Sequence, residues 1–175
     1  MKKTEIIISG VGGQGCVSGG NLLAQAAAIY DGKEALAAVS YGSEARGTFS
    51  KSEVIISGSQ IYFPYAQKPN YIIVMDPVAY DRYVDEVTAD TVIFYDSDTV
   101  TERPSKAAQF GFPMSTMAVS AGSIASLNIV ALGILAKRSQ AVSFEALEQA
   151  IQSRFGKKPK VCASNLTALR SGYGA

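Results

Sequence analysis

The chain has 175 residues, of which 47% are hydrophobic and 18% are charged, and its formal net charge is +1. This composition is typical of a globular chain with a substantial core and excludes intrinsic disorder, while the small net charge gives no sign of a nucleic-acid-binding surface. The sequence contains no histidine, which removes the commonest general base and metal ligand, and at this length we expect a single domain over residues 1–175.

The N-terminus, residues 1–5, leads into an apolar stretch that is too short for the hydrophobic region of a signal peptide, so we expect a cytoplasmic protein. That stretch predicts a strand, and it ends in a glycine loop in which Gly10, Gly12 and Gly15 fit the pattern G-x-G-x-x-G. A helix over residues 21–30 follows, with apolar residues at helical spacing. Because glycines let backbone N–H groups approach an anion and a helix N-terminus adds positive potential, the loop is a candidate phosphate site.

The two cysteines, Cys16 and Cys162, lie far apart in the sequence. An iron–sulfur cluster normally needs four thiolates, and the spacing matches no zinc motif, so no metal site is expected. Cys16 lies at the opening of the first helix, just before the residues that carry the helical pattern, and there the helix dipole could lower the pKa of its thiol. The favoured interpretation is a small residue packed under the glycine loop.

The turn Asp31-Gly32 leads to a second predicted strand over residues 35–40. A Rossmann dinucleotide site has an acidic residue at the end of this strand, where it binds the ribose hydroxyls. Here the strand ends in Val39-Ser40, which argues against NAD. The glycine loop also lacks the G-K-[ST] ending of a P-loop, which argues against phosphoryl transfer.

A second glycine-containing loop, residues 40–50, follows this strand directly. Its candidate ligand-contacting residues are an aromatic, an acid, an arginine and two glycines: Tyr41, Gly42, Glu44, Arg46 and Gly47. Because open α/β sheets bind ligands at the carboxyl ends of their strands, we expect this loop to share a crevice with residues 10–15. Two alternatives stay open for this loop. It could contact another subunit at the same place, or Glu44 and Arg46 could form an internal pair that only stabilises a turn.

The middle of the chain predicts further strands and one capped helix. Asp76-Pro77 has the composition of a helix cap and first helical residue, and this helix should run to about residue 86. Asp96 and Asp98 follow a strand, but two carboxylates without further ligands favour a turn over a metal site. The predicted strands cover residues 53–57, 71–75, 91–95 and 107–113, with a candidate short edge strand at 61–64.

Residues 117–136 form a run of 20 residues without a charge, which is long enough to span a bilayer. Serines and Asn128 dilute its hydrophobicity, so we expect a central helix packed on the sheet, in which Asn128 needs a hydrogen-bond partner. Ser143 should cap a last amphipathic helix that runs to about Phe155. The basic cluster that follows is interpreted as solvated surface, with phosphate attraction as the alternative; it comprises Arg154, Lys157, Lys158 and Lys160.

These elements predict an α/β fold, a three-layer Rossmann-like domain with a mostly parallel sheet and helices on both faces. No nucleophile–base pair can be named, which favours a binding or assembly subunit over a complete enzyme. Two alternatives remain. One is a free-standing NAD(P)- or flavin-dependent oxidoreductase, and the other is a nucleotide-binding regulatory module.

Seven segments in order along the chain make the interpretation more specific: Gly10–Gly15, Asn21–Ala27, Ser40–Gly47, Ser52–Ser57, Ile61–Pro64, Asn128–Gly133 and Asn165. In this combination the chain resembles the gamma subunit of the 2-oxoacid:ferredoxin oxidoreductases, whose members act on pyruvate, 2-oxoglutarate or 2-ketoisovalerate. The resemblance covers nearly the whole chain. One departure is Thr48, where the family pattern often has a second glycine.

The resemblance implies one subunit of a complex that oxidatively decarboxylates a 2-oxoacid, most favourably 2-oxoglutarate, to acyl-CoA with reduction of ferredoxin. It implies thiamine diphosphate between the alpha and beta subunits and iron–sulfur clusters in the beta or delta subunit. No catalytic residue and no cofactor are therefore expected on this chain alone. The expected partners are the alpha, beta and delta subunits, and the isolated chain could form a homodimer through surfaces meant for them.

The resemblance also implies a part in organising the site for coenzyme A. This molecule carries a pyrophosphate and a 3′-phosphate, which need backbone donors and cations. We expect residues 12–15 to present N–H groups, Tyr41 and Glu44 to shape the mouth, and Arg46 to take a phosphate in a bidentate contact. Alternatively, both loops mainly form the interface with the alpha subunit.

Overall fold

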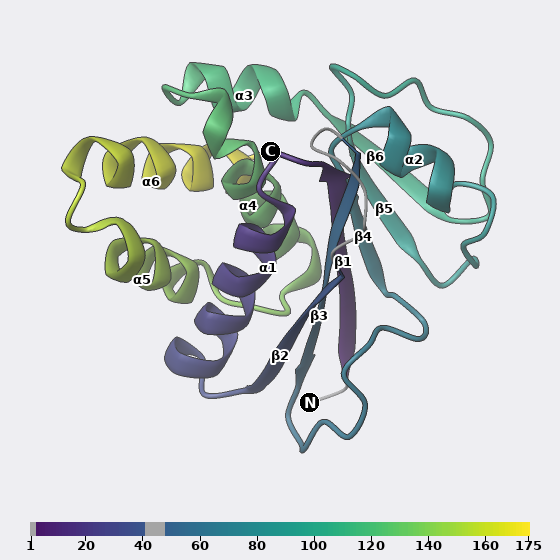
Figure 1. Ribbon diagram of the computed structural model, residues 1–175, viewed down its shortest axis with the longest axis horizontal. Helices are drawn as coiled ribbons and strands as arrows, with labels where there is room; N and C mark the ends of the chain where they lie inside the picture. Colours follow the sequence, from purple (N-terminus) through teal and green to yellow (C-terminus); the bar gives the residue numbers. More distant parts are fainter. Residues whose placement is uncertain (1–2, 41–47) are drawn as a thin grey trace.

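A six-stranded sheet with strand order β2-β3-β1-β4-β5-β6 forms the centre of the molecule (Figure 1). The computed structural model describes residues 3–40 and 48–175. β3 is antiparallel to both of its neighbours and the remaining adjacent pairs are parallel, so the predicted mostly parallel sheet is confirmed. The strands are β1 (Thr4–Val11), β2 (Glu34–Ser40), β3 (Phe49–Ser57), β4 (Tyr71–Val74), β5 (Val92–Asp96) and β6 (Ala108–Phe112).

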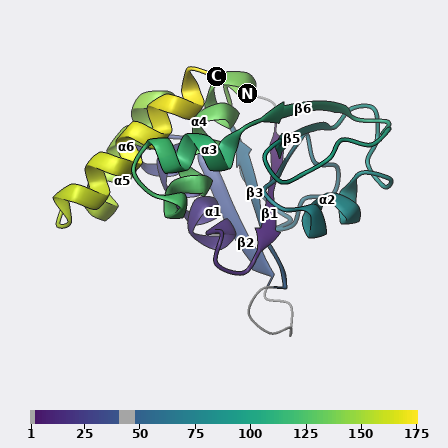
Figure 2. The ribbon, with the colours of Figure 1, turned by 90° about the horizontal axis from the view of Figure 1, so that it is seen from above.

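Helices cover the two faces of the sheet unequally (Figures 1 and 2). One face carries α2 (Pro77–Tyr83). The other face carries a larger group: α1 (Cys16–Gln25), α3 (Met114–Ser120), α4 (Leu127–Ser139), α5 (Phe144–Phe155) and α6 (Pro159–Tyr173). The predicted three layers, with helices on both faces, are therefore present.

Each face of the sheet has its own core, because successive side chains of a strand point to opposite sides. Along β1, Ile6 and Ile8 belong to the larger core under α1 and α4, whereas Ile7 belongs to the smaller core under α2. Central parallel strands buried on both faces have continuous apolar sequences, which is the pattern that identified β4. The ten residues from Leu127 to Ala136 of α4 are all buried, so the central helix predicted in this region exists.

The uncharged run over residues 117–136 is two helices rather than one. α3 ends at Ser120, and Gly122 has a φ of 122°, a backbone conformation that glycine adopts without steric cost. The Ser123 side chain then accepts a hydrogen bond from Ala125 N at 3.1 Å and caps a 3₁₀ turn that leads into α4. Within residues 3–40 and 48–175, no helix combines the length and hydrophobicity needed to cross a bilayer.

The first helix begins at Cys16, five positions before the predicted start, and continues from Ala26 as a π-helix to Tyr30. The prediction started late because Gly19 and Gly20 weaken helical propensity. Their role is close packing: a Cβ on Gly20 would lie 2.7 Å from the Cβ of Ser52 on β3. α1 therefore lies directly on the sheet.

Two further predictions were wrong. The candidate edge strand at 61–64 is not a strand, because β3 is already paired on both sides and offers no free edge to the segment that follows it. The helix that ends near Phe155 is not the last one, because helix α6 follows it with Pro159 at its first turn, a position that tolerates proline.

The two predicted helix caps are confirmed. Asp76 Oδ1 accepts a hydrogen bond from Val78 N at 2.9 Å, although α2 ends at Tyr83, earlier than predicted. Ser143 Oγ accepts one from Ala146 N at 3.1 Å at the start of α5. Both caps could be predicted because a helix cap depends only on a few neighbouring residues.

The backbones of α4 and α6 are in near contact. A Cβ on Gly172 of α6 would collide with the carbonyl oxygen of Val130, and a Cβ on Gly133 of α4 would collide with the carbonyl oxygen of Leu169. This close crossing fixes the position of α6, and with it the position of Asn165 beside the start of α4.

Candidate functional site

The glycine loop lies at the carboxyl end of β1, where β1 adjoins β4. α1 follows β1 on one face of the sheet, and α2 follows β4 on the other face (Figure 1). The connections thus leave in opposite directions at this point, which is a topological switch point. Open α/β sheets bind their ligands in the crevice at such a point.

Gln14 joins the two strand ends at the switch point. Its Oε1 accepts a hydrogen bond from Val11 N at 2.9 Å, and its Nε2 donates to the carbonyl oxygen of Met75 at 3.1 Å. A Cβ on Gly10 would collide with Gln14 Oε1, so this glycine makes room for the bridging side chain. Both residues therefore have a structural reason to be present, whatever the loop binds.

Of the four backbone N–H groups from Gly12 to Gly15, two donate hydrogen bonds to other described residues and two do not. Gly12 N donates to the carbonyl oxygen of Thr48 at 2.9 Å, and Gln14 N donates to that of Val11 at 3.1 Å. In the part of the chain that the structure describes, the N–H groups of Gly13 and Gly15 make no hydrogen bond. Of the four predicted donors, these two are available to a ligand.

Cys16 lies beneath the loop with only 2% of its surface exposed. Burial raises the pKa of its thiol to about 11, against a smaller opposite effect of a hydrogen bond with Ser50. The pKa of the thiol is raised and not lowered, so the thiol is protonated at neutral pH. The interpretation of Cys16 as a packed small residue is therefore supported.

The predicted candidates Tyr41, Gly42, Glu44, Arg46 and Gly47 lie outside the described residues. Thr48, which follows them, accepts the hydrogen bond from Gly12 N and so lies beside the glycine loop. Their contact with a ligand or a subunit stays a prediction.

The two aspartates at the end of β5, Asp96 in the strand and Asp98 in the turn that follows, have structural roles, as the turn interpretation required. Asp96 Oδ1 accepts a hydrogen bond from Asp98 N at 3.2 Å, and Asp98 Oδ2 accepts one from Thr116 N at 2.7 Å. Among residues 3–40 and 48–175, no three metal-ligating side chains are grouped closely enough to hold an ion.

A cavity of about 440 Å³ adjoins the glycine loop and was not predicted from the sequence. It lies between the first turn of α1, the turn that joins α3 to α4, and the first half of α6. Its lining is mainly hydroxyl, carboxamide and apolar groups: Gly15, Ser18, Gly122, Ser123, Ala125, Ser126, Asn128, Ile129, Phe155, Lys160, Val161, Ser164 and Asn165.

Two asparagines that line the cavity are 94% buried, and each uses only one end of its carboxamide. Asn128 Nδ2 donates to the carbonyl oxygen of Gly15 at 3.1 Å, which confirms the predicted need for a partner. Asn165 Oδ1 accepts from Ser126 Oγ at 2.8 Å. Asn128 Oδ1 and Asn165 Nδ2 have no hydrogen-bond partner among the described residues. Every side-chain polar atom that is fully enclosed in the described residues does have a partner, so these two atoms are not fully enclosed and are accessible from the cavity.

The helical spacing of the C-terminal segment could have located Asn165. Asn165, Ala168, Leu169 and Gly172 are spaced i, i+3, i+4 and i+7 and form the buried face of α6. A carboxamide on an otherwise apolar helix face is the signal that was available and was not used.

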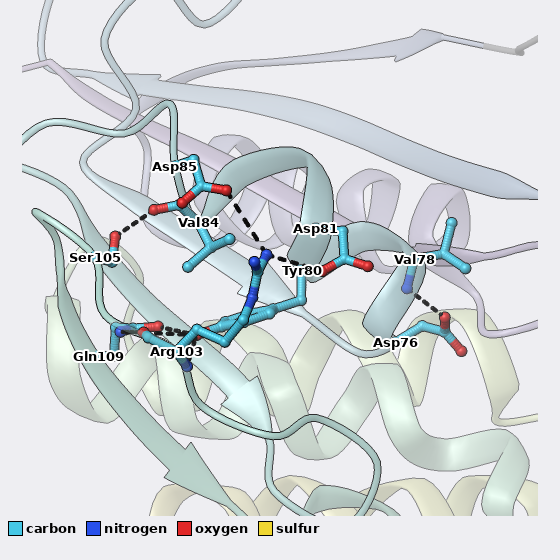
Figure 3. Close-up of polar contacts among 9 residues, drawn as sticks. All are labelled: Asp76, Val78, Tyr80, Asp81, Val84, Asp85, Arg103, Ser105 and Gln109. Carbon is cyan, nitrogen blue, oxygen red and sulfur yellow. Dashed lines mark hydrogen bonds and ion pairs between the residues drawn. The ribbon is translucent and has the colours of Figure 1, made fainter.

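The opposite face of the sheet carries a polar network that is fully paired (Figure 3). Arg103 Nη2 donates to Asp81 Oδ1 at 3.0 Å and lies 3.7 Å from Asp85 Oδ2. The Tyr80 hydroxyl accepts from Arg103 N at 2.9 Å and donates to Gln109 Oε1, while Gln109 Nε2 donates to the carbonyl oxygen of Arg103 at 2.7 Å. This network fastens the segment before β6 to α2.

Comparison with known proteins gives consistent matches over almost the full length. Residues 5–175 match the family described as pyruvate ferredoxin/flavodoxin oxidoreductase. The chain is 39% identical to the 2-oxoglutarate synthase subunit KorC of Methanocaldococcus jannaschii, over 99% of this chain and 93% of that one.

Two solved structures have the same fold. The keto/oxoacid ferredoxin oxidoreductase gamma subunit of Geobacter sulfurreducens is 35% identical with a TM-score of 0.83, over 99% of this chain and 96% of that one. The 2-oxoglutarate:ferredoxin oxidoreductase of Magnetococcus marinus, with 2-oxoglutarate, coenzyme A and succinyl-CoA bound, is 28% identical with a TM-score of 0.89, over 99% of this chain and 31% of that chain.

Proposed function

Because the chain belongs to the pyruvate ferredoxin/flavodoxin oxidoreductase family and is a gamma subunit of a 2-oxoacid:ferredoxin oxidoreductase, we propose that its complex acts on 2-oxoglutarate. The similarity to a 2-oxoglutarate synthase subunit from M. jannaschii supports this substrate. Members of the family also act on pyruvate and 2-ketoisovalerate, so the assembled complex must be assayed with all three acids. A higher kcat/KM for 2-oxoglutarate is expected, and a preference for either other acid would contradict the proposal.

Within such a complex, this chain assists the chemistry without performing it. Thiamine diphosphate supplies the stabilisation of the carbanion in this family. Under the proposal, that cofactor is held by the alpha and beta subunits and the iron–sulfur clusters by the beta or delta subunit. Residues 1–175 then serve as one gamma-type domain that helps to organise the complex and the site for coenzyme A.

The proposed contact with coenzyme A rests on one observation, the two unpaired N–H groups at the switch point. Those of Gly13 and Gly15 stand at the start of α1, where the helix dipole favours an anion. Coenzyme A carries phosphates that need such donors. Arg46, in the neighbouring loop, is the proposed cation for a phosphate.

Reversing the charge of Arg46 separates a binding role from an interface role. We expect Arg46→Glu to leave the complex assembled and to raise its KM for coenzyme A at least tenfold, while the KM for the 2-oxoacid stays within twofold. Lys106→Glu reverses an exposed charge before β6 and serves as the matched control. Failed assembly together with unchanged coenzyme A kinetics in the residual complex would assign the loop to the interface instead.

A further inference from the structure

The polar groups of the cavity beside α1 are complementary to a ligand that both donates and accepts hydrogen bonds. Asn128 Oδ1 is a free acceptor and Asn165 Nδ2 is a free donor, and both belong to side chains that are 94% buried. A bound molecule that offers one hydrogen-bond donor and one acceptor would pair both atoms. Their other ends are fixed by Gly15 and Ser126, which holds the two carboxamides in place.

The walls of the cavity favour an apolar body beside these polar groups. Ala125, Ile129, Phe155 and Val161 contribute hydrocarbon surface to the lining. The volume of about 440 Å³ lies within the range of about 300–1,000 Å³ that is usual for small-molecule sites. An aromatic ring with a polar edge fits this combination of apolar walls and two carboxamides.

One cation, Lys160, lines the cavity, at the first turn of the 15-residue helix α6. Arg154, Lys157 and Lys158 are exposed and lie close to Lys160 in the sequence. None of these four side chains forms an ion pair in the part of the chain that the structure describes. No carboxylate is among the described lining residues, and the N-terminus of α6 adds positive potential. The outer part of the ligand should therefore be an anion.

We propose that this cavity binds an adenine nucleotide, with the base at Asn128 and Asn165 and one phosphate at Lys160. The adenine edge places an amino donor beside a ring nitrogen acceptor, so the amino group can donate to Asn128 Oδ1 while the ring nitrogen accepts from Asn165 Nδ2. The nucleotide has two sources: the adenosine 3′,5′-bisphosphate end of coenzyme A or a free adenine nucleotide. The first source rests on the proposed function and the second does not.

The test is calorimetric titration of the full chain with adenosine 3′,5′-bisphosphate and with ADP. Asn165→Asp keeps an oxygen for Ser126 and replaces the free donor by a charge, so it should weaken binding at least tenfold. Lys160→Glu should also weaken binding, and it should reduce the dependence of the affinity on salt. Gln152→Ala removes an exposed carboxamide of α5 outside the cavity, and this control should bind as the unaltered chain does.

Thermal unfolding of each variant establishes that it is folded. Absence of binding by the unaltered chain at millimolar nucleotide, or binding that Asn165→Asp and Lys160→Glu leave unchanged, would overturn the proposal. Equal affinity for the guanosine counterparts would overturn the assignment of the base. Competition by coenzyme A supports the first source, and binding of ADP without such competition supports the second.

The outcome is separable from that of the proposed function. A complex that prefers another 2-oxoacid, or one in which Arg46→Glu leaves coenzyme A kinetics unchanged, would contradict the proposed function while nucleotide binding by the chain stands. Conversely, a chain that binds no nucleotide, in a complex whose KM for coenzyme A is raised by Arg46→Glu, would contradict the cavity proposal and leave the proposed function standing.

Discussion

The network on the α2 face and the cavity beside α1 use similar polar side chains in opposite ways. Gln109 uses both ends of its carboxamide, and the Tyr80 hydroxyl both donates and accepts (Figure 3). Asn128 and Asn165 are equally well held at one end, but their other ends face open space. A carboxamide paired at both ends holds the fold together, whereas one that is paired at a single end beside a cavity is available to a ligand.

The largest expected effect comes from separating α6 from α4, which would open the cavity. Gly172→Ala places a Cβ against the backbone carbonyl of Val130, which cannot move aside cheaply. We expect a loss of about 3 kcal/mol in the free energy of unfolding, measured by urea denaturation, together with loss of nucleotide binding.

Gly174→Ala is the matched control, because its Cβ would lie 3.4 Å from the carbonyl oxygen of Arg170, an ordinary contact. If Gly172→Ala destabilises the protein no more than Gly174→Ala does, the backbones of α4 and α6 do not approach each other as closely as described.

A smaller effect is expected in the paired network. Tyr80→Phe removes a hydroxyl that accepts from Arg103 N and donates to Gln109, on a side chain that is 2% exposed. The unfolding free energy should fall by about 1–3 kcal/mol, because these partners lose a hydrogen bond, while nucleotide affinity stays unchanged. Tyr62→Phe, at an exposed position, should change neither. Weakened nucleotide binding in Tyr80→Phe would contradict the claim that the α2 network stabilises the fold without affecting the cavity.

The smallest effect concerns a third, fully paired group at the end of the first helical segment. Burial alone would raise the pKa of Asp31, but hydrogen bonds from Ser143 and the ion pair with Lys33 outweigh it and lower the pKa. A lowered folded-state pKa contributes stability above the unfolded value of about 3.9, and this is lost as the pH falls through the folded value.

Asp31→Asn should therefore cost about 1–2 kcal/mol near neutral pH and less in acid, measured by denaturation across the pH range. A cost that does not decrease toward low pH would contradict the pairing with Ser143 and Lys33.

Local signals in the sequence predicted most of the framework. The caps at Asp76 and Ser143 and the apolar strands of the sheet each depend on a few neighbouring residues. The break at Gly122 was missed because hydrophobicity alone does not reveal a positive φ. α6 was missed although its apolar spacing is present in the sequence, and the reason for a glycine at position 172 is visible only in the contact with α4.

The candidate site was predicted only in part, for a related reason. The glycine loop has a local motif, whereas the cavity is formed by three segments that are distant in sequence, around residues 15–18, 122–129 and 155–165. Asn128 could be expected to need a partner, but only the fold shows that the partner is the carbonyl of Gly15. The roles of Tyr41, Glu44 and Arg46 stay predictions.

A structure of the assembled oxidoreductase complex with coenzyme A bound would examine both proposed sites at once. We expect phosphate within hydrogen-bond distance of the Gly13 or Gly15 N–H group, and an adenine ring, from coenzyme A or a free nucleotide, against Asn128 and Asn165. Coenzyme A bound away from this chain, with residues 10–15 and the cavity both filled by side chains of the alpha subunit, would contradict this expectation and make both features an assembly surface.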